Sequence, residues 1–170
     1  MADKGIRFEM VREDSRRMIH LVMGFIQRVD ILRRKAHFGD TDQAIVAGMV
    51  AVGEAVGLAA IEAESRKADF RDKFGNFETV IGVEGQRPVS ATTISLATGI
   101  PRETVRRKLK LLLERGVIVE KTRGAYVMKP GFIQQPETMD IVDRGMRDTL
   151  QFMNDCVKLG LVRWVDDETD

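Results

Sequence analysis

Cysteine is nearly absent from this chain of 170 residues, since Cys156 is its single one. A single cysteine excludes an internal disulfide framework and is typical of a protein in a reducing cytoplasm. Histidine is also scarce, and His20 and His37 do not have the spacing of metal ligands with each other or with Cys156. The sequence therefore predicts no metal and no other cofactor.

Catalytic motifs are missing as well. The sequence has no G-x-S-x-G nucleophile motif and no glycine-rich phosphate loop after a predicted strand. Together with the two isolated histidines, these absences argue against an enzyme. The N-terminal residues carry charges but no apolar signal core, so we expect a cytoplasmic protein rather than a secreted one.

The net charge is small, +1, but it is unevenly distributed along the chain. Residues 101–129 contain nine Arg and Lys against three Glu, a net charge of +6. Residues 137–170 contain four basic and nine acidic residues, a net charge of −5. One basic stretch in a neutral chain is typical of localised binding to a polyanion, and a solvated helix face is the alternative.

The basic stretch belongs to a recognisable succession of elements over residues 88–129: a helix, a tight turn, a second helix and a β-hairpin. Three N-cap residue types precede the first helix, namely Ser90, Thr92 and Thr93. The apolar side of that helix is expected to consist of Ile94, Leu96 and Ala97. Gly99 permits a sharp turn, and Pro101 suits the first position of the second helix.

The second helix, at about residues 101–115, has two different faces. Its apolar residues follow the i, i+4, i+7 spacing of a buried stripe: Val105, Leu109 and Leu112. Its complementary face is polar and mostly basic: Arg102, Thr104, Arg106, Arg107 and Lys110. Gly116 ends the helix, and a hairpin with its turn at 122–124 occupies residues 117–129.

The run LATGIPRETVRRKLKLLLERGVI, residues 96–118, resembles the winged helix-turn-helix transcription regulators. Long helices before and after it resemble the MarR-type regulators, in which terminal helices build a dimer. The resemblance implies a mainly α fold with a small β-hairpin wing. It also implies that residues 101–115 lie in the DNA major groove and that residues 117–129 lie on the minor groove or backbone.

The resemblance also assigns double-stranded DNA contacts to named residues. Base edges would be reached from the first half of the second helix by Arg102, Thr104, Arg106 and Arg107. Phosphates would be held by Ser90, Thr92, Thr93 and Lys110. Arg123 at the wing tip would meet the minor groove or the backbone. The alternative is a winged-helix module that binds an acidic protein partner without specific DNA binding.

The chain ends predict long amphipathic helices. Residues 7–37 and 139–161 carry apolar residues at alternating spacings of three and four, the a and d positions of a heptad repeat. Such stripes must be buried, either within one domain or against a second copy. Because a small winged domain cannot cover them both, we expect a homodimer. The methionine-rich second stripe leaves open an adaptable small-molecule effector pocket, with core packing as the favoured interpretation.

Residues 44–61 form an apolar stretch that reaches the length of a membrane span. Glu54 lies in its middle, and a carboxylate costs about 2.5–3.5 kcal/mol there. We therefore favour a helix packed closely through its small residues, including the GxxxG pair Gly53 and Gly57, over a membrane anchor. Thr41 or Asp42 is expected to cap this helix.

These patterns predict four regions. An N-terminal helical dimerisation region spans residues 7–73, and the winged helix-turn-helix domain, opened by a short helix over Phe74–Ile81, spans 74–131. A C-terminal dimerisation helix spans 136–165, and an acidic tail spans 166–170. The sequence does not define the operator, the direction of regulation or an effector.

Overall fold

The computed structural model describes residues 7–10, 12–37, 39–64, 76 and 78–165. Two compact units share the chain. Residues 33–140 form one, which we name the winged unit, and the residues up to 32 together with those from 141 form the other, the helical unit. The predicted acidic tail, 166–170, lies outside the described residues.

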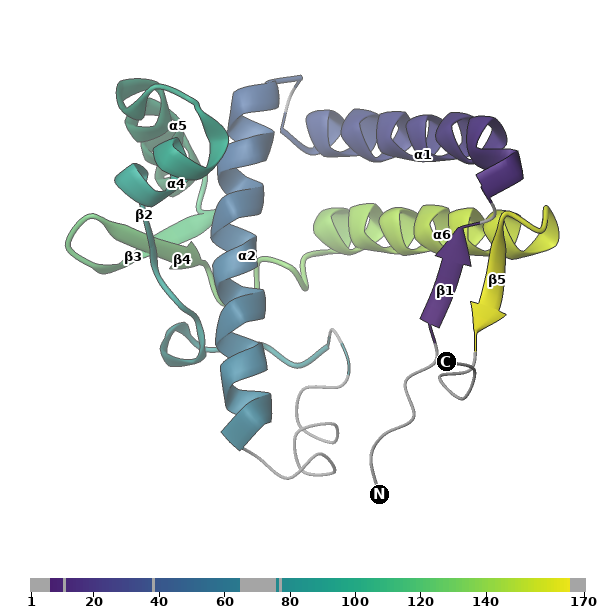
Figure 1. Cartoon of the computed structure of the whole chain (residues 1–170). Helices are drawn as coiled ribbons and strands as arrows, with labels where there is room; N and C mark the ends of the chain where they lie inside the picture. Colours follow the sequence, from purple (N-terminus) through teal and green to yellow (C-terminus); the bar gives the residue numbers. More distant parts are fainter. Residues whose placement is uncertain (1–6, 11, 38, 65–75, 77, 166–170) are drawn as a thin grey trace. The chain divides into compact units, whose positions relative to one another are not determined.

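The winged unit combines helices with a small antiparallel sheet (Figure 1). Its helical elements are α2 (Thr41–Glu64), η2 (Val83–Gly85), α4 (Ala91–Thr98) and α5 (Arg102–Glu114). Its strands are β2 (Val89–Ser90), β3 (Ile118–Thr122) and β4 (Ala125–Met128), in the order β2-β4-β3. The predicted helix, turn, helix and hairpin are confirmed, and so is a mainly α fold with a small β wing.

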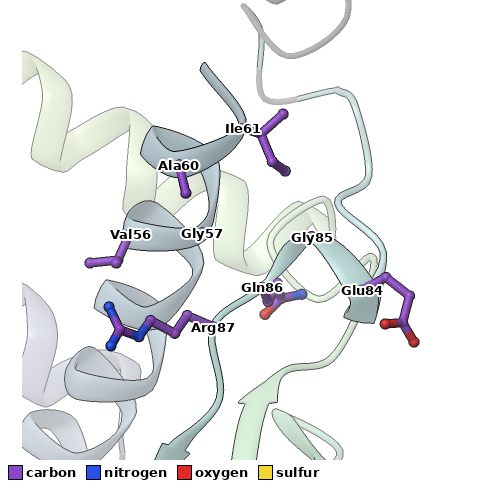
Figure 2. A pocket seen from close by; sticks show the side chains of 8 residues that line it. All are labelled: Val56, Gly57, Ala60, Ile61, Glu84, Gly85, Gln86 and Arg87. Atoms are coloured by element: carbon purple, nitrogen blue, oxygen red, sulfur yellow. The ribbon is translucent and has the colours of Figure 1, made fainter. Parts of the chain in front are cut away.

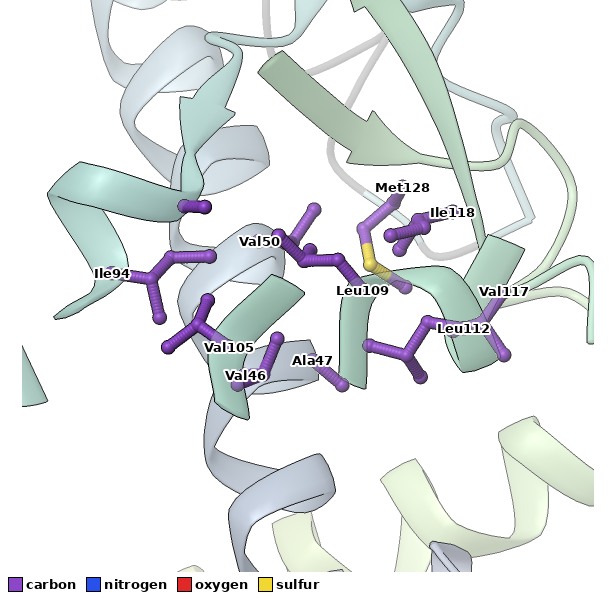
Figure 3. Packing of buried hydrophobic residues seen from close by; sticks show 11 residues of the cluster. Val46, Ala47, Val50, Ile94, Val105, Leu109, Leu112, Val117, Ile118 and Met128 are labelled. Atoms are coloured by element: carbon purple, nitrogen blue, oxygen red, sulfur yellow. The ribbon is translucent and has the colours of Figure 1, made fainter. Parts of the chain in front are cut away.

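The core of the winged unit lies between α2, α4, α5 and the hairpin (Figure 3). Val46 and Val50 of α2 are fully buried, as is Ile94 of α4. They meet the stripe of α5 that the sequence predicted as buried, which is confirmed: Val105, Leu109 and Leu112. Fully burying one such aliphatic side chain contributes about 1.5–3 kcal/mol, so this core holds α5 firmly in place.

Helix α2 is therefore the third helix of the winged fold. The sequence had placed it in the N-terminal region 7–73 and had predicted a short helix over Phe74–Ile81 instead. Phe74 and Phe77 lie outside the described residues, and residues 80–82 are not helical. Asn76 Oδ1 accepts hydrogen bonds from the Glu78 and Thr79 amides, at 3.1 and 3.2 Å, which makes a turn there.

The pair Gly53 and Gly57 lets α2 approach the backbone before β2. A Cβ on Gly53 would lie 2.4 Å from the Arg87 carbonyl oxygen, and one on Gly57 would lie 2.3 Å from that of Gly85. Gly53 also accepts a hydrogen bond from the Arg87 amide, at 3.1 Å. The GxxxG pair thus packs within the fold, as expected. By length and composition alone α2 could also span a membrane, since an 18-residue window within residues 41–63 has a mean hydropathy of 2.1.

Asp40 fastens the start of α2 to α5. Its Oδ1 accepts a hydrogen bond from the Gln43 amide at 2.9 Å, so it is Asp40, rather than the expected Thr41 or Asp42, that caps α2. Its Oδ2 accepts a hydrogen bond from Lys108 Nζ on α5. The Lys108 side chain is only 11% exposed, so this ion pair is shielded from solvent. One carboxylate therefore caps α2 and positions α5.

Asp40→Asn is expected to destabilise the winged unit at neutral pH by about 1–2 kcal/mol, because a shielded charged hydrogen bond is lost. Burial raises the pKa of Asp40, but hydrogen bonds from Lys108 and Gln43 outweigh it and leave the pKa below its ordinary value. Because the pKa of Asp40 is lower in the folded than in the unfolded protein, its carboxylate stabilises the fold at pH values above the unfolded pKa. This stabilisation is lost as the pH falls through the folded pKa. Urea unfolding should therefore separate wild type from variant at pH 7 and bring them together in acid.

Asp42→Asn is the matched control, because it removes a carboxylate from the same helical turn without a contact to Lys108. It should leave the pH dependence of unfolding unchanged. A constant gap between wild type and Asp40→Asn from pH 7 into acid would contradict the role of the Asp40 charge.

The helical unit contains two long helices and a two-stranded ribbon (Figure 1). Its elements are β1 (Arg7–Met10), η1 (Arg12–Asp14), α1 (Ser15–Ala36), α6 (Pro136–Lys158) and β5 (Val162–Val165), where α1 and α6 run on into the winged unit. Long helices are confirmed near both ends, but the predicted bounds are wrong. Residues 7–10 and 162–165 are paired strands, so the first helix begins later and the last one ends earlier than predicted.

Helices α1 and α6 lie side by side and antiparallel. Phe25 stacks on Phe152 with ring centroids 4.7 Å apart, and Arg28 Nε lies 3.9 Å from Asp148 Oδ1. A Cβ on Gly145 would lie 3.8 Å from Leu32 Cδ2. Residues further along α1 thus contact residues earlier in α6, as expected for antiparallel helices. On α1 the predicted heptad residues Phe25 and Leu32 provide this contact, whereas on α6 it falls on Gly145, Asp148 and Phe152, one residue before the predicted stripe.

Candidate nucleic-acid interface

Local hydrogen bonds define both ends of α4 and the turn that leads into α5. Ser90 caps α4, since its Oγ accepts a hydrogen bond from the Thr93 amide at 3.1 Å. At the other end Gly99 has φ 74°, a left-handed conformation that favours glycine, and its amide bonds to Ser95 O. Pro101 is the residue before α5 rather than its first residue. The predicted cap and sharp turn are confirmed.

Two predicted phosphate contacts take part in this cap. Ser90 Oγ lies 3.0 Å from Thr93 Oγ1, so both hydroxyls are used within the protein. Thr92 is exposed beside them. The expected apolar side of α4 is wrong in part, because Leu96 is 83% exposed while Ile94 is fully buried. At the start of α4, Thr92 is thus free to contact a ligand. Ser90 and Thr93 could do so only with hydroxyl groups that already have a partner within the protein.

Helix α5 presents its basic face away from the core. The outermost line of the helix, opposite Val105 and Leu109, has the spacing i, i+4, i+7, i+11 and consists of Glu103, Arg107, Lys110 and Glu114. Arg106 is exposed beside this line, and Arg102 is exposed at the start of the helix. Thr104 is half-buried on the flank. The structure therefore leaves four predicted basic residues of α5 exposed to solvent, and we name this set the α5 face: Arg102, Arg106, Arg107 and Lys110.

Two other basic residues of this segment serve the fold instead. Lys108 points to Asp40, so only four of the five basic residues between 102 and 110 reach the α5 face. Lys121 of β3 donates hydrogen bonds to the backbone oxygens of Glu84 and Gln86, at 3.2 and 3.0 Å. The net charge of residues 101–129 does not distinguish cations that stabilise the fold from cations that are exposed, because Asp40 and the Glu84–Gln86 segment lie far from Lys108 and Lys121 in sequence.

The ion pairs on the α5 face are weak. Arg106 Nη1 lies 3.6 Å from Glu103 Oε2, and Lys110 Nζ lies 3.9 Å from Glu114 Oε1. Exposed pairs of this kind contribute about 0–1 kcal/mol, so both cations remain available to another anion. Arg102 and Arg107 form no ion pair within the described residues.

The wing places one more cation in solvent. Strands β3 and β4 are joined by a turn in which the Gly124 amide donates a hydrogen bond to Glu120 Oε1. Arg123 is exposed in that turn. The wing tip is thus a defined turn that carries the predicted Arg123 on its outside.

A pocket of about 310 Å³ opens beside α2 (Figure 2). Its apolar wall is Val56, Ala60 and Ile61, and its opposite wall is the segment 84–87. The Glu84 side chain extends away from α2 and lies 3.8 Å from Lys121 Nζ. The volume is at the lower end of the range for small-molecule sites, but these side chains do not define the chemistry of an effector.

Residues 84–143 match the sequence profile of the family described as Firmicute plasmid replication protein (RepL). The match begins at η2, covers α4, α5 and the wing, and ends within α6. RepL is a winged-helix, DNA-binding family, so the match agrees with the winged fold and supports duplex DNA as the partner. It does not reach residues 7–83, on which the MarR-like arrangement largely rests. Comparison with curated proteins and with solved structures finds no match.

Proposed function

We propose that the chain is a sequence-specific transcription regulator that binds duplex DNA as a homodimer in the cytoplasm and has no enzymatic activity. Helix α5 enters the major groove, and the wing, residues 117–129, meets the minor groove or backbone. One observation carries this proposal. The α5 face holds four exposed cations on a helix that a buried core fixes in place, within the segment that matches a DNA-binding family.

Each cation of the α5 face has a chemically suitable role. Arginine donates two parallel hydrogen bonds to guanine, a contact worth about 1–3 kcal/mol of base discrimination. Arg102, Arg106 and Arg107 stand in the first half of α5, the part of a recognition helix that reaches base edges. Lys110 lies one turn further along and suits a phosphate, as does Arg123 on the wing.

Homodimerisation is supported by exposed apolar residues of the helical unit. On α1 they are Ile19, Met23 and Ile26, which are 50–61% exposed. On α6 they are Met146, Leu150, Met153 and Val157, at spacings of i, i+4, i+7 and i+11. Around the axis of each helix, the exposed stripe lies about a third of a turn from the residues that contact the other helix. The direction of this rotation along the chain is the same on α1 and α6. In an antiparallel pair this rotation puts both stripes on the same side.

The shared side of α1 and α6, which we name the apolar face, has the size of a dimer interface. Helices of 22 and 23 residues are each about 30 Å long and 10 Å wide, so the pair presents on the order of 600 Å² in projection. Stable interfaces bury about 800 Å² of accessible surface on each partner. Two copies that meet through this face would form a four-helix arrangement with a two-fold axis.

Leu150→Lys is expected to convert the dimer into monomers, because it places a charge in the centre of the apolar face. Leu150 is 59% exposed in the protomer, so the protomer itself should still fold. Gln151→Lys is the matched control, since Gln151 is also exposed but points away from the apolar face. Sedimentation equilibrium at micromolar concentration should show a monomer for Leu150→Lys and a dimer for the control. A monomeric wild type would contradict the dimer.

Replication is a second candidate function, and the match to a plasmid replication family favours it. An initiator and a regulator both need specific DNA binding, so the α5 face serves either. The remaining alternative, a protein-interaction module, predicts that the α5 face binds an acidic protein surface and prefers no duplex.

The deciding experiment is selection of bound duplexes from a random pool, followed by mapping of the bound sites in the host. A regulator should select two half-sites about 10 base pairs apart, centre to centre, that overlap promoters. An initiator should select a site within an origin, and a plasmid carrying that site should replicate only when the protein is present. Failure to select any sequence would overturn both functions.

A further inference from the structure

Glu103 is an acidic residue in the middle of the exposed cations of α5. It lies on the outermost line of the helix, one turn before Arg107, and its side chain is 85% exposed. Arg106 Nη1 lies 3.6 Å from its Oε2. A surface that binds DNA through positive charge therefore carries a carboxylate at the end of α5 that reaches deepest toward the bases.

A carboxylate in this place needs a hydrogen-bond donor when DNA is bound. The phosphates around a groove repel it, and its exposed pair with Arg106 compensates only weakly. In the major groove, cytosine N4 and adenine N6 carry amino groups that donate hydrogen bonds. The major-groove atoms of guanine and the O4 of thymine only accept them. Glu103 would therefore bind beside cytosine or adenine and would be repelled beside guanine or thymine.

We propose that Glu103 determines sequence specificity by accepting a hydrogen bond from the exocyclic amino group of a cytosine or adenine. Arg106 stands beside it, with its Nη1 3.6 Å from Glu103 Oε2, and can contact a neighbouring base. Glu103 works chiefly by exclusion, since it penalises half-sites that place guanine or thymine, whose major-groove atoms only accept hydrogen bonds, at the position where it needs the amino group. The proposal rests on the proposed function and adds a base preference to it.

A purely structural role makes a different prediction. Glu103 stands in the first turn of α5, where a negative charge interacts favourably with the helix dipole. If that were its only role, its removal would weaken α5 and lower binding to every duplex alike. Base discrimination at a single position separates the two roles, because a change in stability does not alter it.

The test uses the full-length protein and the duplex selected by the wild type, with each base pair of a half-site replaced in turn by the other three. Where the contacted base is cytosine, Glu103→Gln should lose about fivefold or more of the discrimination at one base pair per half-site. Where it is adenine, which glutamine also binds, Glu103→Ala should show this loss. Glu103→Gln should also bind a scrambled duplex more tightly than the wild type does, because one negative charge is gone. Circular dichroism and thermal unfolding verify that each variant is folded.

Glu114→Gln is the matched control. Glu114 lies on the same line of α5, pairs with Lys110 at 3.9 Å and is 56% exposed, but it stands at the other end of the helix. Its substitution should leave the discrimination profile unchanged. Equal loss of affinity for all duplexes, or a profile that is unaltered in both Glu103→Gln and Glu103→Ala, would overturn this proposal. The wild type's own sequence preference would keep the proposed function intact.

Discussion

Gly57→Ala is expected to destabilise the winged unit by about 1–3 kcal/mol, the usual cost of overpacking a tight site. The new methyl group would lie 2.3 Å from Gly85 O and 3.0 Å from the Arg87 amide nitrogen. Both are backbone atoms, which cannot turn aside as the end of a side chain can. Helix α2 or the segment before β2 must shift, and this segment leads directly into the cap of α4.

The control for this substitution is Gly24→Ala. Gly24 also lies within a long helix, and its nearest neighbour would be the end of the flexible Arg28 side chain, at 3.5 Å. Alanine is about 1 kcal/mol better than glycine within a helix, so this control should be stabilised. Urea unfolding measures both changes, and hydrogen exchange in α5 and β4 assigns the loss to the winged unit. A Gly57→Ala protein at least as stable as wild type would contradict the close approach.

Arg107→Ala is expected to reduce affinity for the selected duplex by about 5- to 150-fold, the loss of one bidentate base contact. Arg107 stands in the centre of the α5 face. It helps to lower the pKa of Asp40, but Asp40 keeps its hydrogen bond from Lys108 when Arg107 is removed, so no acid is left unpaired. Discrimination at one base pair should fall together with the affinity. Fluorescence anisotropy with the selected and the substituted duplexes measures both.

Arg16→Ala is the control for the change in net charge. Arg16 is exposed on α1 in the helical unit, so its removal takes away the same charge without touching the α5 face. Its effect on binding should be within about twofold, because Arg16 does not belong to the α5 face and a single exposed surface charge contributes little. Equal losses for the two variants would show that charge alone, and not the α5 face, governs binding.

The helix, turn, helix and wing could be predicted from the sequence because their signals are local. Gly99 marks the turn, and Val105 and Leu109 mark the buried side of α5 within a few residues of each other. Helix α2 was assigned to the wrong region for the opposite reason. Apolar residues occupy almost the whole circumference of α2, so no single buried face can be recognised from the sequence. Its contacts with Gly85 and Arg87 join segments that are about thirty residues apart.

The candidate site shows the same limit. Arg107 and Lys110 could be placed on the outer face by helical spacing alone. Lys108 could not be excluded, because its partner Asp40 lies 68 residues away. Glu103 does not belong to the basic pattern that predicts the site, although its i, i+4 spacing to Arg107 places it on the same line of α5. Leu96 was expected in the core by residue type, and the structure leaves it in solvent.

The central claim is that the α5 face binds a specific duplex. The most direct measurement is a titration of the full-length protein with its selected duplex and a scrambled one across a range of salt concentrations. We expect log affinity to fall linearly with log salt, with a slope of about −0.9 for each phosphate neutralised. We also expect the preference for the selected duplex to persist throughout. A slope near zero, or equal binding to both duplexes at every salt concentration, would contradict the account.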